Sequence, residues 1–156
     1  MARVASFGEI ADEFERRWRR TVWATMTTAG RQGRLQSRLV HPLWESSIGW
    51  VLTGSDALKA RHLRGNSHTS LTYWDQANEQ AHAECRAEFV TVPEEKRRVW
   101  NLFKDTPFPL GYDPALFFHE GPEAPSVGVV RLVPWRIELW SMAELLSGAP
   151  SHVWLA

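Results

Sequence analysis

The sequence has little cysteine, no net charge and no long apolar run. Cys85 is the one cysteine among 156 residues, which excludes an internal disulfide and fits a reducing compartment. Lys plus Arg and Asp plus Glu number 18 each, so the basic surplus of proteins that grip nucleic acid along their length is missing. No 18-residue apolar run and no signal-like segment is present. We therefore expect a cytoplasmic protein that binds neither membranes nor nucleic acid.

The motifs of metal and hydrolase chemistry are also missing. The sequence contains no HExxH, no paired CxxC and no GxSxG. His82 and Cys85 are three residues apart in an alternating segment, so their side chains are expected on opposite faces of a strand. We therefore expect no metal site, and we interpret Cys85 as a packed thiol. These patterns identify no catalytic residue.

The composition and the hydrophobic pattern indicate one globular, mainly β domain over residues 1–156. Hydrophobic residues make up 44% of the chain and nine are tryptophan, enough for a substantial core. An apolar stripe predicts an amphipathic helix over residues 7–20, with its arginines on the solvated side. Strands are predicted over 21–28, 35–44, 48–54, 68–75, 80–90, 127–134 and 136–141. Short helices separate some of them, which predicts a small antiparallel β-barrel of about six strands over residues 21–142, with a short C-terminal tail.

The segment 48–66, IGWVLTGSDALKARHLRGN, changes from an apolar strand to a cationic helix. Ser55 or Asp56 is predicted to cap this helix, which is expected over residues 56–65. A strand end, a small polar turn, a helix start and a lysine can together bind a phosphate. The candidate residues are Thr53, Gly54, Ser55 and Lys59, with Arg38 on the neighbouring strand. The alternative is a solvated helix with an ordinary cap.

The order of these segments resembles the pyridoxamine 5′-phosphate oxidase-like family of flavin-binding split β-barrels, which includes deazaflavin-dependent reductases. The resemblance lies in RLQSRLVHPLW, in the segment from IGWVLTGS to SLTYWD, in QAHAECRAEFV and in VVRLVPWRIELW. It implies a six-stranded split barrel with peripheral helices, and a homodimer with two cofactors in clefts between the subunits. The implied cofactor is FMN, with the deazaflavin coenzyme F-420 as the alternative.

The resemblance also implies which residues contact the cofactor. Its phosphate would lie against Arg38, Thr53, Gly54, Ser55 and Lys59. The segment Arg38, Leu39, Val40, His41 and Pro42 would run beside the flavin ring, Trp140 would close the site, and Gln80 would contact the flavin. His41 is the candidate proton donor, or else it makes a hydrogen bond within the structure.

Three departures separate this chain from the oxidase that gives the family its name. Leu58 and Leu43 stand where that enzyme has a phosphate-binding arginine and lysine, and SMAELLSGAP after Trp140 has no Arg or His. An anionic vitamin phosphate would be left unpaired, so pyridoxamine phosphate oxidation is not expected. We expect a flavin-dependent oxidoreductase acting on a small molecule, with the substrate pocket in residues 105–122. A deazaflavin-dependent reductase, a non-catalytic flavin-binding or stress-related protein, and a barrel for another apolar ligand or none are the alternatives.

Overall fold

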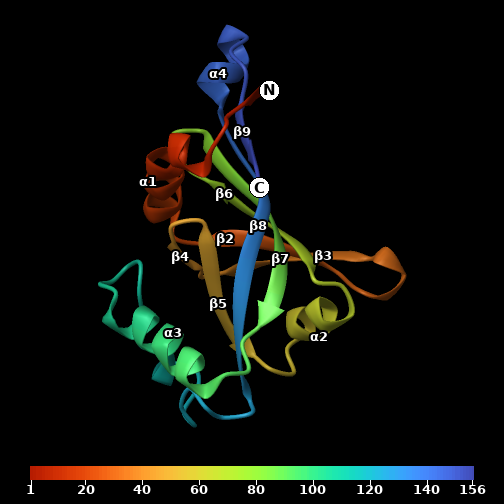
Figure 1. Cartoon of the computed structure of the whole chain (residues 1–156), viewed down its shortest axis with the longest axis vertical. Coiled ribbons are helices and arrows are strands. Elements are labelled where there is room, and N and C mark those ends of the chain that lie inside the picture. Colours follow the sequence, from red (N-terminus) through yellow and green to blue (C-terminus); the bar gives the residue numbers. More distant parts are fainter.

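A computed structural model describes all residues, 1–156, and shows one β-rich body with helices around it (Figure 1). Nine strands form a single sheet, so the predicted split-barrel class is confirmed although the strand count is higher. The strands are β1 (Ala2–Arg3), β2 (Ala24–Ala29), β3 (Leu35–Val40), β4 (Leu43–Glu45), β5 (Ile48–Gly54), β6 (His68–Trp74), β7 (Glu79–Phe89), β8 (Val127–Ser141) and β9 (His152–Leu155).

The sheet follows the order β1-β9-β8-β7-β6-β2-β3, and β5 pairs with both β4 and β8. All pairs are antiparallel except β1 with β9. The period-two pattern of β7 is confirmed, because Ala81, Ala83, Cys85 and Ala87 are all buried. Their small side chains face the core, where Tyr73 accepts a hydrogen bond from Trp44 Nε1 (2.8 Å). Burial raises the pKa of the Cys85 thiol.

The two strands predicted over 127–134 and 136–141 are one continuous strand, β8. The register against β7 shifts between Glu84 and Cys85, whose partners are Arg136 and Pro134. This is a β-bulge that skips Trp135. Pro134 has no N–H to give to the ladder, and the bulge accommodates it without ending the strand.

The single strand predicted over 35–44 is instead divided into β3 and β4. The division falls at His41 and Pro42, where the proline removes one backbone donor. β3 pairs with β2, whereas β4 pairs with β5. The chain therefore leaves one part of the sheet for another at His41.

The main helices are α1 (Ala11–Thr21), α2 (Leu58–Gly65), α3 (Pro93–Asp105) and α4 (Met142–Ser147). The predicted stripe of α1 is confirmed, since Ile10, Phe14 and Trp18 are buried. Short 3-10 turns lie at Phe7–Glu9, Arg31–Gly33 and Pro114–Leu116. Residues 142–155, for which no element was predicted, form α4 and β9. No helix combines the length and apolar character needed to cross a membrane.

α1 is joined to the sheet by an arginine that was predicted to be solvated. Arg17 is buried, and its Nη1 donates to the carbonyl oxygens of Gln80 and Trp140, at 2.6 Å each. Its Nε donates to Glu13 (2.7 Å), which neutralises the guanidinium. Both accepting carbonyls lie where β7 and β8 pair, so Arg17 fastens the helix to this strand pair.

Candidate functional site

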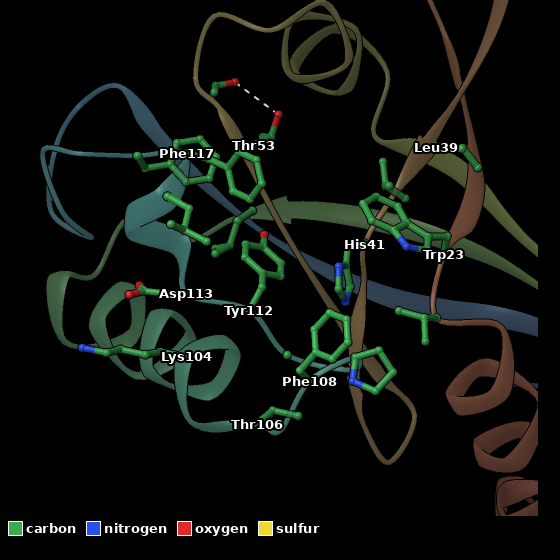
Figure 2. Close-up of a pocket in the computed structure, with 18 of the residues that line it drawn as sticks. Trp23, Leu39, His41, Thr53, Lys104, Thr106, Phe108, Tyr112, Asp113 and Phe117 are labelled. Atoms are coloured by element: carbon green, nitrogen blue, oxygen red, sulfur yellow. Dashed lines mark hydrogen bonds between the residues drawn. The ribbon is translucent and has the colours of Figure 1, made fainter.

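A cleft of about 840 Å³ opens between the end of α1, the β3–β4 junction, the end of β5 and the segment 104–118. Figure 2 shows its walls, with aromatic side chains from different elements facing one another. Six of the residues predicted to contact a cofactor line it: Leu39, Val40, His41, Thr53, Gly54 and Lys59. Residues from β3, β5 and α2, which are separate in the sequence, thus line one cleft.

Arg38 and Lys59 form the cationic end of this region. Burial lowers the pKa of both side chains, and the charge of Arg38 lowers the pKa of Lys59 further. Arg38 Nη1 donates to Thr28 Oγ1 (2.8 Å) and to the carbonyl oxygen of Met26 (3.3 Å). No ion pair of the protein includes either cation. Two half-buried like charges without an acidic partner favour a bound anion, because an anion would remove their repulsion.

Two residues beside this pair were not predicted from the sequence. Thr28 Oγ1, which accepts from Arg38, also lies 3.0 Å from His62 Nδ1. His62 packs closely over Gly30, where an added Cβ would come within 2.7 Å of the imidazole. The sequence does show a cationic run from Lys59 to Arg64, but nothing in that run indicates that His62, and not Arg61 or Arg64, lies beside the anion site.

The start of α2 differs in detail from the predicted cap. Ala57 occupies the cap position, and no side chain caps the helix. The backbone N–H of Ser55 donates to the carbonyl oxygen of Ser126 (2.8 Å), so it is not free for a ligand. The backbone N–H of Arg61 donates to the carbonyl oxygen of Ala57, at 3.1 Å. The amides of Leu58 and Lys59 precede it and belong to the unpaired first turn, which favours anions.

His41 stands in the middle of the cleft wall, between two aromatic rings. Its ring centroid is 4.9 Å from those of Trp23 and Tyr112. Its Nε2 is 2.7 Å from the carbonyl oxygen of Leu110. Since a carbonyl only accepts, Nε2 carries the proton. Burial lowers the pKa of His41, so the ring is neutral at pH 7 and Nδ1 is an acceptor. His41 therefore fits the predicted alternative of a hydrogen bond within the structure.

The segment predicted to hold the substrate pocket supplies one wall of the cleft. Thr106, Phe108, Tyr112, Leu116 and Phe117 all line it. The rings of Phe103 and Phe117 pack against Tyr112, with centroids 5.2 and 5.6 Å away. Lys104 and Asp113 lie at the rim and point away from the centre (Figure 2). Apart from Lys59, the interior of the cleft is thus aromatic and uncharged.

The other predicted contact residues do not line the cleft of their own chain: Arg38, Pro42, Ser55, Gln80 and Trp140. Pro42 is buried behind it. Gln80 and Trp140 are partners in the β7–β8 ladder, and the Trp140 ring is 5.4 Å from that of Trp74. Within one chain, Gln80 and Trp140 lie on a different surface from Lys59.

The shape and chemistry of the cleft fit a flat molecule with a phosphate. Leu39, Val40 and Leu52 give apolar contacts, and the half-buried Lys59 lines the cleft together with Thr53 and Gly54. Ligand sites of this kind combine mainly apolar walls with a few placed polar groups. No group of three or more His, Cys, Asp or Glu side chains is arranged to hold a metal ion.

The chain was also compared with known proteins. The family model described as pyridoxamine 5′-phosphate oxidase matches residues 10–141. No curated protein matches the sequence significantly.

Solved structures share the fold at low sequence identity. A Clostridium acetobutylicum protein related to general stress protein 26 has a TM-score of 0.73 and 10% identity, with 94% of each chain covered. A conserved hypothetical protein of Mycobacterium tuberculosis has a TM-score of 0.66 and 24% identity, covering 94% of this chain and 90% of that chain. An FMN-binding protein of Nostoc punctiforme has a TM-score of 0.65 and 13% identity, covering 95% and 88%.

Proposed function

This chain belongs to the pyridoxamine 5′-phosphate oxidase family, and from that premise we propose that it is a flavin-binding oxidoreductase. The cofactor is FMN, with the deazaflavin coenzyme F-420 as the alternative. One observation carries the proposal: Lys59, half-buried and without an acidic partner, lines an aromatic cleft, and its charge is repelled by the neighbouring Arg38. The two cations would hold the phosphate, and Leu39 to His41 would lie along the ring.

The bound cofactor would supply the hydride chemistry, and the chain's own residues bind and orient the reactants. Lys59, Arg38 and the first turn of α2 neutralise the phosphate. Trp23, His41 and Tyr112 form a wall that keeps water from the ring. His41, with its proton held by Leu110, orients that wall and does not supply a proton.

The substrate that we propose is not a vitamin phosphate. Leu43, at the position of the oxidase's substrate-binding lysine, is buried and apolar. Leu58 replaces an arginine and is solvent-exposed. The segment after Trp140 forms α4 and contains no Arg or His. Inside the cleft a second anionic group would have no cation beside it, since Lys104 lies at the rim and points away, and burying it unpaired is costly.

We propose a homodimer as the assembly that completes the site. Gln80 and Trp140 lie outside the cleft of their own chain. A second copy could place them over the cofactor bound to the first. The exposed side chains of Trp23, Leu39, Trp74 and Trp135 are apolar surface of the kind that subunits cover.

Replacing Lys59 tests the cofactor site directly. We expect Lys59→Ala to weaken FMN binding by on the order of tenfold or more, because it removes a charge-assisted contact with the phosphate. The dissociation constant can be measured from the change in flavin fluorescence. Arg61→Ala is the matched control, since Arg61 is an exposed cation of the same helix. Equal affinities for the wild type and Lys59→Ala would refute the phosphate assignment.

A second measurement separates an enzyme from a flavin carrier. The absorbance spectrum and the mass of the cofactor released from purified protein distinguish FMN from the deazaflavin. Transfer from NAD(P)H or from reduced deazaflavin to an acceptor then supports the oxidoreductase. A coloured protein without transfer would favour the non-catalytic flavin-binding alternative.

A further inference from the structure

The hydroxyl of Tyr112 is a polar group in the cleft that the proposed cofactor contacts do not use. No hydrogen bond within the protein includes this hydroxyl. Every buried side-chain polar atom has a partner, so the hydroxyl of Tyr112 is not buried. The hydroxyl is therefore open to the cleft that Tyr112 lines. In Figure 2 it points inward, away from α3.

The position of this hydroxyl is fixed by the rings around it. His41, Phe103 and Phe117 have centroids 4.9, 5.2 and 5.6 Å from the Tyr112 ring. These contacts come from the β3–β4 junction, from α3 and from the short 3-10 turn after Asp113. A donor held by packing on three sides loses little freedom when it binds a ligand.

The ionisation of Tyr112 determines what it can do. Burial raises the pKa of Tyr112 to about 12, so the hydroxyl keeps its proton near pH 7. The neighbouring His41 cannot serve as the donor, because its proton is bonded to Leu110. Tyr112 is thus a free hydroxyl donor in the aromatic part of the cleft.

The surroundings of this donor select a class of ligand. Phe108, Leu116 and Phe117 are apolar and strongly exposed at the cleft mouth, although each lines the cavity. Lys104 and Asp113 point away from it (Figure 2), and Lys59 lies at the phosphate end. A charged ligand beside Tyr112 would lose its hydration without gaining a partner, whereas a flat apolar ligand could stack on these rings.

We propose that Tyr112 positions the substrate by donating a hydrogen bond to an oxygen of an uncharged, planar aromatic molecule, such as an aryl ketone or aldehyde. The inference rests on the proposed function, in that the cofactor phosphate lies at Lys59 and the ring along Leu39 to His41, which leaves the hydroxyl of Tyr112 to the substrate. It adds the class of substrate and the residue that recognises its oxygen.

Binding of three probes with the same ring tests this inference without measuring turnover. The probes are 2-acetylnaphthalene, 2-naphthoate and naphthalene, titrated into the protein as purified by isothermal calorimetry. We expect the ketone to bind more tightly than the carboxylate and the hydrocarbon. In Tyr112→Phe the affinity for the ketone should fall about three- to tenfold, the usual range for one net hydrogen bond. The affinity for naphthalene should stay the same.

Tyr73→Phe is the matched control, because it removes the hydroxyl of the other tyrosine, which lies in the core. It should leave all three affinities unchanged. Equal ketone affinity in Tyr112→Phe and wild type would overturn the inference, as would tighter binding of 2-naphthoate. Loss of FMN affinity in Tyr112→Phe would also overturn it, since the hydroxyl would then serve the cofactor. A wild type that binds no flavin refutes the proposed function, while the dependence of ketone binding on Tyr112 is still measured.

Discussion

The protonation and orientation of His41 in the cleft depend on a backbone carbonyl that is distant in the sequence. Its place beside the proposed ring was predicted from the segment 38–42, and it does line the cleft. Its partner Leu110 is 69 residues away, in a segment without a periodic pattern. No local signal in the sequence identifies that contact, so the choice between proton donor and structural hydrogen bond needed the fold.

The burial of His41 predicts a stability that depends on pH. Its pKa is lowered from the ordinary value of 6.5. The contribution of His41 to the free energy of unfolding is therefore present above about pH 6.5 and is lost as the pH falls through the lowered pKa. Burial lowers the pKa of His82 in the same way. We therefore expect the free energy of unfolding to fall as the pH is lowered from 7 to 5, because the unfolded chain takes up these protons more readily than the folded protein.

His41→Gln separates this contribution from the others. Glutamine can donate to the Leu110 carbonyl and does not titrate, so the variant should lose less stability than the wild type between pH 7 and pH 5. Urea unfolding at both pH values measures the difference. Equal losses of unfolding free energy in His41→Gln and the wild type would show that His41 does not cause the pH dependence.

At the level of elements, Arg17 connects α1 to the strand pair β7–β8. Arg17→Met keeps much of the side-chain volume but leaves the carbonyls of Gln80 and Trp140 without their donor. We expect the free energy of unfolding to fall by about 2–4 kcal/mol, since hydrogen bonds to a buried charge are strong and orphaned acceptors are costly.

Arg16→Met, on the same helix, is the control for Arg17→Met. Arg16 is exposed, and its ion pairs with Glu13 and Glu79 should contribute less than about 1 kcal/mol. Chemical denaturation of the two variants compares them. Similar losses would mean that Arg17 contributes only as a surface charge.

The elements also show where sequence patterns succeed. β7 was predicted from its alternation because one face is buried and the other is polar, a property of the strand itself. The division at His41 and Pro42 and the continuity of β8 depend on which strands lie alongside. α4 and β9 were missed because they are only six and four residues long, and β9 is positioned by pairing with β8.

For the whole molecule, the separation of Lys59 from Trp140 predicts a site shared between two chains. We expect light scattering to give about twice the 17.9 kDa of one chain. Lys59→Ala and Trp140→Ala should each weaken FMN binding when pure. After the two variants are mixed and their subunits exchanged, about a quarter of the sites should regain wild-type affinity, because half of the dimers then carry one intact site.

No recovery after subunit exchange would mean that the site is built within one chain, and a monomer would contradict the assembly itself. The sequence alone could not make this distinction. Arg38 was expected on a strand beside Thr53, but β3 pairs with β2, whereas β5 pairs with β4 and β8. Spacing along the chain also does not show whether Trp140 serves its own cleft or that of a partner.

The single thiol gives a way to follow these variants without purification. Cys85 has no exposed surface, and its raised pKa keeps it as the unreactive thiol. Alkylating reagents should therefore reach it only when the β7–β8 ladder opens. The rate of a mass increase at Cys85 then reports how often each molecule unfolds, and it can be read by mass spectrometry in a cell extract.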